Sequence, residues 1–144
     1  MRLLRKATPI PFDPAISRDE ALSYWFRAGT QTYLAEEGNR AVGTYILRAN
    51  QPDAGAHVAN AAYMVAPATQ GRGVGQTMAE HSLGEARRMG FRAMQFNFVV
   101  STNELAVCLW EKLGFKIVGT LPEAFRHPTK GYVDAYVMFR SLLD

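Results

Sequence analysis

Three alternating glycines between a strand pattern and a helix pattern constrain this fold more than any other feature of the sequence. Residues 70–75 read Gln-Gly-Arg-Gly-Val-Gly. A backbone without Cβ atoms can approach a ligand closely, and the free amides and dipole at a helix start favour an anion. The spacing matches neither the phosphate loop G-x-x-x-x-G-K-S/T nor the dinucleotide-binding motif G-x-G-x-x-G. The segment is therefore either an anion site of another kind or a tight turn.

Strand patterns occupy most of the chain on both sides of this loop. Segments rich in Thr, Tyr, Val, Ile and Phe and bounded by turn residues are typical of strands. They cover residues 32–36, 40–48, 57–65, 93–100, 115–121 and 132–141. Gly38 and Asn39 separate the first two, which predicts a β-hairpin. The polar, proline-containing residues 122–131 are expected to form a loop between the last two strands.

Apolar spacing and capping residues predict three helices. They cover residues 17–27, 74–89 and about 104–113. Gly90 is well placed as the C-cap of the long central helix. Capping boxes at Ser17 with Glu20 and at Ser101 with Glu104 would start the other two helices, because each hydroxyl and carboxylate can satisfy a free amide.

The order of these elements predicts a single α/β domain over residues 1–144. A two-residue hairpin joins antiparallel strands, whereas a crossover helix joins parallel strands in a right-handed turn. Strand 57–65 is therefore expected to lie parallel to strand 93–100. We predict a mixed, mostly antiparallel sheet with this parallel pair at its centre and helices flanking it.

Composition narrows the classes of function. A chain of 144 residues can bury a core that is stable without a metal ion or disulfide bonds. Its lone Cys108 fits a reducing, cytoplasmic compartment. No apolar run is long enough to cross a membrane and no secretory signal is visible, so no membrane partner is expected. The three histidines lack metal-ligand spacing, so no metal is expected either. The net charge is only +3 and the 16 basic residues are spread along the chain, so nucleic-acid binding is a poor hypothesis.

A second motif follows strand 93–100. Residues 103–115 fit the pattern N-x-x-A-x-x-L-x-x-x-x-G-F. Together with Q-x-x-G-x-G at residues 70–75, this pattern resembles the acetyl-CoA signature of the GNAT acetyltransferase superfamily, over about residues 32–142. The resemblance implies a GNAT-like fold with acetyl-CoA as cosubstrate. It also implies contacts to CoA from Met64, Val65, Gln70, Gly71, Arg72, Gly73, Val74, Gly75, Gln76, Asn103, Ala106 and Trp110.

The resemblance also implies roles for particular residues. Backbone amides of residues 70–75 would cradle the pyrophosphate, and the backbone near Met64 and Val65 would pair with the pantetheine arm like an extra strand. The Val65 amide would face the thioester carbonyl, while Asn103 would hydrogen-bond the pantetheine and Ala106 would leave room for it. The implied chemistry is direct attack of a neutral amine on the thioester in a ternary complex, through an oxyanion stabilised by preorganised donors.

The sequence departs from the family in two places. Trp110 stands where the family usually has a tyrosine that is assigned to protonate the departing thiolate, and an indole N–H is not a usable acid. A CoA-binding or sensory module with weak turnover is therefore the alternative to an enzyme. The thirty or so residues before the hairpin hold one clear helix, so we expect a shortened N-terminal layer. That layer would leave apolar sheet surface for a partner subunit, as in a homodimer.

Polar residues in the two central strands suggest the acceptor. Around His57, Asn60, Asn97 and Trp110 the sequence resembles, more narrowly, yeast acetyltransferases that act on proline analogues such as azetidine-2-carboxylate. That resemblance suggests Asn60 and Asn97 as substrate-site residues for a small amine, an amino or imino acid; the alternative is two satisfied core amides. His57 is either a base that acts through water or a surface residue. Gln95, on the same side as Asn97, either orients it or marks where the strand meets solvent.

Overall fold

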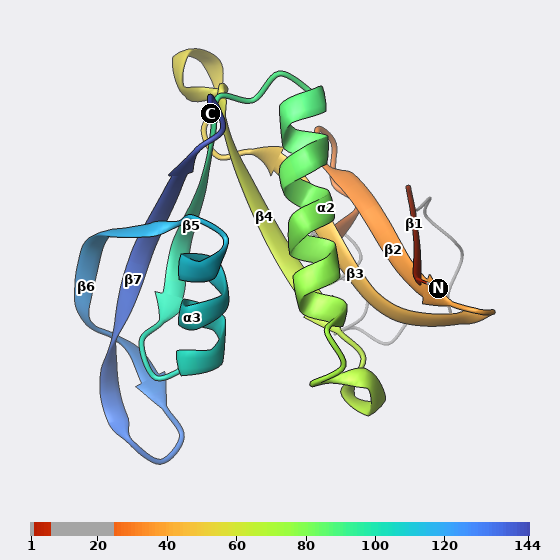
Figure 1. Cartoon of the computed structure of the whole chain (residues 1–144). Coiled ribbons are helices and arrows are strands. Elements are labelled where there is room, and N and C mark those ends of the chain that lie inside the picture. Colours follow the sequence, from red (N-terminus) through yellow and green to blue (C-terminus); the bar gives the residue numbers. More distant parts are fainter. Residues whose placement is uncertain (1, 7–24) are drawn as a thin grey trace.

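The computed structural model describes residues 2–6 and 25–144, and seven strands of this part of the chain form a single sheet (Figure 1). The strands are β1 (Arg2–Lys6), β2 (Gln31–Glu37), β3 (Arg40–Ala49), β4 (Val58–Val65), β5 (Ala93–Val100), β6 (Lys116–His127) and β7 (Gly131–Ser141). The helices are α2 (Val74–Arg88) and α3 (Glu104–Lys112), with short 3-10 turns at Asp53–Gly55 and Pro67–Thr69. The predicted alternation of strands and helices is confirmed from β2 to β7.

The sheet is mixed, with one parallel pair near its centre. The strand order is β1-β2-β3-β4-β5-β7-β6, and each neighbouring pair is antiparallel except β4 with β5. Helix α2 makes the crossover between these two parallel strands, as a right-handed connection requires. The predicted fold class, an α/β fold whose mostly antiparallel sheet has a central parallel pair flanked by helices, is confirmed.

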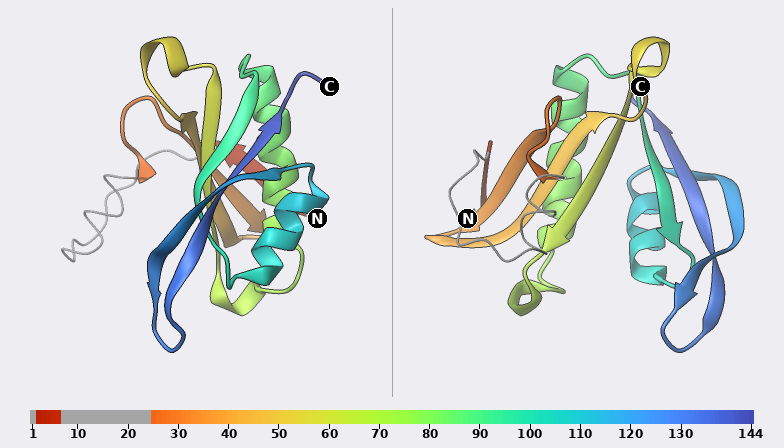
Figure 2. Two further views of the ribbon diagram at one scale, coloured as in Figure 1. Left: turned by 90° about the vertical axis from the view of Figure 1, so that its left-hand side faces the viewer. Right: turned by 180° about the vertical axis from the view of Figure 1, so that it is seen from behind.

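The two parallel strands separate soon after they pair. Their pairing consists of Val58 with Ala93 and Ala59 with Met94, whereas β4 pairs with β3 along its whole length. Beyond these pairs the strands form the two arms of a V that opens toward the start of α2 (Figure 1). Figure 2 shows the same opening from behind, with α2 over the β4 arm and α3 over the β5 arm. We call this opening the split.

One face of the sheet packs against the helices. Ala59 and Ala61 of β4 and Met94 of β5 alternate onto this face and join Met78 of α2 in the main core. Gly43 of β3 allows the close approach of α2, because a Cβ atom there would lie 2.8 Å from Met78 Cε. The intervening residues of β4 and β5 therefore point to the opposite face.

One strand was not predicted and one predicted loop is wrong. The strand that was not predicted is β1, which pairs antiparallel with β2 at the edge of the sheet. The loop predicted over residues 122–131 is mostly strand, because β6 continues to His127 and pairs with β7 on both sides of an irregularity. Glu123 has a φ of 52° within that irregularity, which lets the ladder break and resume.

One helix starts differently from the prediction. The N-cap of α3 is Asn103 rather than Ser101, and its Oδ1 accepts a hydrogen bond from Ala106 N at 3.3 Å. The capping box at residues 17–20 lies outside the described residues, and so does most of the helix that it was expected to start. The predicted shortening of the N-terminal layer falls on the same undescribed part of the chain.

Aromatic rings on β2 and β3 meet polar groups of α2. Tyr33 and Tyr45 are stacked with their ring centroids 4.6 Å apart. The Tyr33 hydroxyl donates to Glu85 Oε1 at 2.8 Å, and the Tyr45 hydroxyl lies 2.6 Å from His81 Nδ1. Burial and the adjacent carboxylate raise the pKa of Tyr33 to about 12. Hydrogen bonds from Arg88 and then Tyr33 lower the pKa of Glu85 to about 2, so the folded protein holds this carboxylate ionised.

Acid is expected to destabilise the protein in part through Glu85. Because its pKa is lowered on folding, its contribution to the free energy of unfolding is complete above about pH 4.5 and is lost as the pH falls toward 2. In Glu85→Gln, the fall in the free energy of unfolding on acidification should be smaller than in the parent by about 1 kcal/mol. The difference is modest because the partner Arg88 is largely exposed and its charge is screened. Urea unfolding at about pH 5.5 and about pH 2.5 measures it. Glu111→Gln, at an exposed position on α3, is the control, and equal losses in Glu85→Gln and the parent would contradict the assignment.

Candidate functional site

The edge of β4 that faces β5 lies open along the split. Asn50 N donates to Val58 O at 2.8 Å, so Val58 directs its backbone groups toward β3. Because this direction alternates along an antiparallel strand, the odd-numbered residues of β4 direct theirs toward β5. β5 pairs only with the first two residues of β4, so within the described residues the split receives the unpaired N–H and C=O groups of Ala61, Tyr63 and Val65. Such an edge can pair with an extended ligand as it would with another strand.

The glycine loop begins just beyond this edge. Gly71 and Gly73 each have a φ of 80°, a left-handed conformation that glycine adopts without strain. Gly73 is the N-cap of α2, and no described side chain caps that helix. The first-turn amides of Val74, Gly75 and Gln76 therefore point out of the helix end without an intrahelical acceptor. Together with the helix dipole they can bind an anion such as a pyrophosphate.

The loop presents free backbone amides to a ligand, whereas two of its side chains bind other residues of the protein. A Cβ atom on Gly75 would lie 3.8 Å from Val65 Cγ2, so the first turn of α2 lies against the end of β4. Arg72 forms an ion pair with Glu37 of β2 at 3.3 Å, and the Gln76 amide donates along the helix to the next turn at 3.1 Å. The open edge and the free amides are thus continuous, while these two side chains have partners within the protein.

An aromatic cluster closes the helix side of the split. The ring centroid of Trp110 lies 5.2 Å from that of Tyr63 on β4 and 4.5 Å from that of Phe96 on β5. Phe115 stacks on Phe96, also at 4.5 Å. The Tyr63 hydroxyl shares a 2.6 Å hydrogen bond with Ser82 Oγ, and burial raises the pKa of this phenol well above its usual range. Trp110 therefore bridges the two arms, and the Tyr63 phenol beside it stays protonated.

Asn60 lies where β4 and β5 part. It is buried on the face opposite α2, and its Nδ2 donates to the Gln95 carbonyl oxygen at 2.9 Å. That carbonyl follows directly after Met94, the last residue of β5 that pairs with β4. A side-chain amide therefore takes the acceptor that a further backbone pairing would use. The structure shows Asn60 satisfied as a bridge between the arms.

Asn97 belongs to a chain of amide groups on the same face. Gln95 Nε2 donates to Asn97 Oδ1 at 2.9 Å, and Asn97 Nδ2 donates to Asn50 Oδ1 at 2.6 Å. Gln95 therefore does orient Asn97. We call Asn50, Asn60, Gln95 and Asn97 the amide cluster. Asn50 was missed in the sequence, where a polar residue in a turn gives no sign that the loop returns to the neighbouring strands.

The structure does not bring His57 and Val65 together. His57 is exposed just before β4, at the closed end of the split, where its carbonyl accepts a hydrogen bond from Arg92 N at 2.8 Å. Val65 lies at the other end of the same strand, eight residues and about 26 Å away in an extended chain. A base at His57 would therefore act far from the amide that is expected to face the thioester.

The remaining predicted CoA contacts lie around the open end of the split. Asn103 and Ala106 form the first turn of α3 on the β5 arm (Figure 1), and the cap uses Asn103 Oδ1, which leaves Nδ2 as a donor. Met64 is 56% exposed near the end of β4, on the face away from α2. Gln70 is exposed at the end of the Pro67–Thr69 turn. Both arms and the loop between them thus contribute predicted contacts.

The described part of the chain contains no group of three or more His, Cys, Asp or Glu side chains that could hold a metal ion. None of its helices is long and apolar enough to cross a membrane.

The acetyltransferase (GNAT) family matches residues 1–115. N-acetyltransferase aca1 of Schizosaccharomyces pombe is 30% identical over 154 residues, which cover 93% of this chain and 74% of that protein. A GCN5-related N-acetyltransferase from Kribbella flavida is 39% identical, with a TM-score of 0.89 over 97% of both chains. The fold is shared with yncA of Salmonella typhimurium, solved with its cofactor acetyl-CoA, at a TM-score of 0.79 and 21% identity over 98% of this chain and 94% of that one. These relatives do not confirm the narrower resemblance to enzymes of proline analogues.

Proposed function

Because the chain belongs to the acetyltransferase (GNAT) family, we propose that it transfers the acetyl group of acetyl-CoA to the amine of a small amino or imino acid. Acetyl-CoA-dependent acetylation is the activity of the family, and the acceptor and the mechanism are our proposal. One observation carries the assignment of acetyl-CoA: the open edge of β4 leads directly into the start of α2, which no described side chain caps. An extended chain of amides that ends in a pyrophosphate, as CoA does, matches both parts.

The described residues fit acetyl-CoA at this junction. The backbone groups of Ala61, Tyr63 and Val65 would pair with the amides of the pantetheine arm. The first-turn amides of α2 would hold the pyrophosphate, and a Cβ atom on Gly71 would meet nothing within 4 Å, so the loop has open space beside it. Asn103 Nδ2 would donate to the arm from the β5 side.

In the proposed ternary complex, acetyl-CoA supplies a thioester whose carbonyl carbon forms a bond with a neutral amine while the bond to sulfur breaks and CoA leaves as a thiolate. An N–H of the open β4 edge, from Ala61, Tyr63 or Val65, would donate to the carbonyl oxygen as negative charge develops there. The amide cluster would accept a hydrogen bond from the attacking amine but cannot take its proton, so water removes it. The chain thus contributes positioning and charge stabilisation, with no covalent intermediate on the enzyme.

The chemistry of the amide cluster favours a zwitterionic acceptor. A neutral carboxamide can donate to a carboxylate and accept from an amine without adding a charge that needs its own partner. Asn97 is exposed, so a ligand can reach it, and Gln95 and Asn50 fix its orientation. A small amino or imino acid presents both of the groups that such amides can bind.

A panel of acceptors tests the proposal. Release of free CoA is measured with free amino acids, imino acids, a peptide N-terminus and a lysine side chain as acceptors. We expect the highest kcat/KM for a free amino or imino acid. Faster acetylation of the peptide or of the lysine than of every free acid tested would contradict the proposed acceptor.

Trp110→Phe is expected to retain kcat within about tenfold, whereas removal of a general acid typically costs about 10² to 10⁴. A free thiol has a pKa of about 8.5, so the CoA thiolate is a tolerable leaving group near neutral pH without a protein acid. Trp110 would instead shape the pocket by its contacts with Tyr63 and Phe96. Turnover, CoA affinity and unfolding are measured together. A thousandfold fall in kcat with fold and CoA affinity intact would show that this role is wrong.

The second candidate function is a CoA-binding or sensory module with weak turnover. The observation that favours it is the indole at position 110, in place of the phenol usual in the family. Trp110→Tyr discriminates between the two functions, because it restores a phenol beside the split. An increase in kcat of more than about a hundredfold would favour the module, since it would show that the parent lacks an acid it needs.

A further inference from the structure

A basic cavity lies between α2, the end of α3 and β7, on the side of the helices. It has a volume of about 420 Å³ and is lined by Glu80, Leu83, Arg87, Lys112, Leu113, Gly114 and Arg140. Three of these side chains are cationic and one is acidic, so the lining carries an excess of positive charge. The proposed transfer reaction uses none of them.

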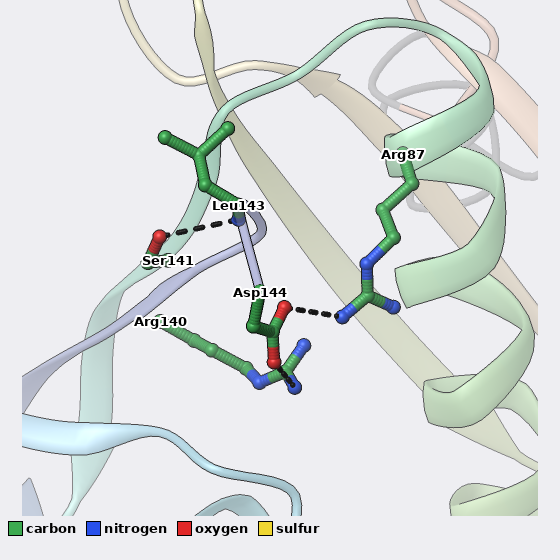
Figure 3. Close-up of polar contacts among 5 residues, drawn as sticks. All are labelled: Arg87, Arg140, Ser141, Leu143 and Asp144. Carbon is green, nitrogen blue, oxygen red and sulfur yellow. Dashed lines mark hydrogen bonds and ion pairs between the residues drawn. The ribbon is translucent and has the colours of Figure 1, made fainter.

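A carboxylate of the chain already bridges two of these cations (Figure 3). Asp144 Oδ1 lies 3.0 Å from Arg87 Nη2, and Asp144 Oδ2 lies 3.0 Å from Arg140 Nη2. A turn in which Leu143 N donates to Ser141 Oγ at 3.2 Å returns Asp144 toward β7. The hydrogen bond from Arg87 and the charge of Arg140 hold the pKa of Asp144 below its usual value. This edge of the cavity therefore already holds one carboxylate, that of Asp144.

The bridge leaves part of Arg140 unused. Its Nη1 is buried and has no hydrogen-bond partner in the described part of the chain. A buried donor without a partner is costly, so an additional acceptor there would be favourable. The guanidinium is held in place by packing, because a Cβ atom on Gly114 would lie 2.7 Å from Arg140 Nε. Its position therefore does not depend on Asp144 alone.

We propose that the basic cavity binds a small oxyanion, a carboxylate or phosphate group, in place of the Asp144 carboxylate. The oxygens of the ligand accept hydrogen bonds from Arg87 Nη2 and Arg140 Nη2, as the Asp144 oxygens do, and the exposed Lys112 adds positive charge. Asp144 is the internal competitor of the ligand. The site is separate from the glycine loop, since Arg87 lies fourteen residues along α2 from Gly73, a distance of about 21 Å.

Asp144→Asn tests the competition directly. The substitution keeps the size of the side chain and removes its charge, so oxyanions should bind more tightly to the variant than to the parent. Calorimetry on the whole chain without CoA uses inorganic phosphate in one arm and succinate in the other, with the ionic strength held constant by NaCl. We expect at least one anion to bind about fivefold or more tightly, because a charged competitor has been removed. The arm that responds identifies a phosphate or a carboxylate ligand.

Two further variants in the Asp144→Asn background locate the anion. Arg87→Gln should abolish the gain, whereas Gly73→Glu should preserve it, because the latter alters only the glycine loop. Unfolding of each variant is measured to show that it is folded. The proposal requires that Asp144→Asn raises the affinity for the anion, that adding Arg87→Gln removes this increase, and that adding Gly73→Glu retains it. An unchanged affinity in Asp144→Asn, or any other pattern among the variants, overturns the proposal.

Discussion

Gly73→Glu is expected to weaken CoA binding by at least about a hundredfold. Gly73 is the N-cap of α2 with a φ of 80°, directly before the amides that would hold the pyrophosphate. A glutamate there adds bulk and a negative charge beside the phosphates. Charge-assisted hydrogen bonds contribute about 1.5 to 3 kcal/mol each, so the loss of two gives at least this change in affinity. Calorimetry with CoA measures it.

Gly73→Gln is the matched control for that variant. It has nearly the same size and the same strained backbone but no charge, so its loss of CoA affinity should be clearly smaller. The unfolding of both variants is followed to separate binding from stability. If Gly73→Glu bound CoA as tightly as the parent, the pyrophosphate would not lie at this loop.

Asn97→Ala is expected to lower kcat/KM for the acceptor by about 5-fold to 150-fold, equivalent to about 1 to 3 kcal/mol, and to leave CoA affinity unchanged. The substitution removes the amide that Gln95 and Asn50 orient, so a bound carboxylate would lack a donor. Steady-state kinetics with the best acceptor of the panel gives kcat/KM, and calorimetry gives the affinity for CoA.

The control for this variant is Asn39→Ala, an exposed asparagine in the turn between β2 and β3. It should change neither quantity. Asn60→Ala is compared in parallel, with the expectation that it also lowers the free energy of unfolding, because it leaves the Gln95 carbonyl without its donor. Unchanged kinetics in both Asn97→Ala and Asn60→Ala would remove the amide cluster from the acceptor site.

The elements from β2 to β7 were predictable because their signals are local. Helix α2 has regular apolar spacing and ends before Gly90, where the observed φ is 87°. The turn at Gly38 and Asn39 joins β2 and β3 as expected. The parallel pairing of β4 and β5 followed from the crossover helix between them. Each of these inferences needs only neighbouring residues or the order of elements.

The errors arise where pairing partners are distant or two local signals compete. β1 is five residues long with three basic side chains, and its partner β2 begins 25 residues after it ends. In the second half of β6, Pro122 and the polar residues after it are typical of a loop, yet these residues pair with β7. The positive φ of Glu123 accommodates the irregularity between the two paired parts. At α3, Ser101 and Asn103 were both suitable caps, and only the geometry of the turn selects Asn103.

The candidate site stays a prediction. Its motif residues form two contiguous segments of sequence, which lie at the glycine loop and at the start of α3. The split itself was not predictable, because the length of the β4–β5 pairing depends on where the Asn60 side chain replaces a backbone partner. Asn50 was missed for a related reason, since its contact with Asn97 joins residues 47 positions apart.

The position of β7 affects how the sheet can be assembled during synthesis. β1 to β5 lie side by side in chain order, so each can pair with its predecessor as it leaves the ribosome, with a small loop-closure cost. β7 is the last strand to be made but lies between β5 and β6, so β6 has no described neighbour until β7 inserts. A chain arrested before Gly131 would therefore expose an open edge on β5 and an unpaired β6, and open edges of this kind promote aggregation.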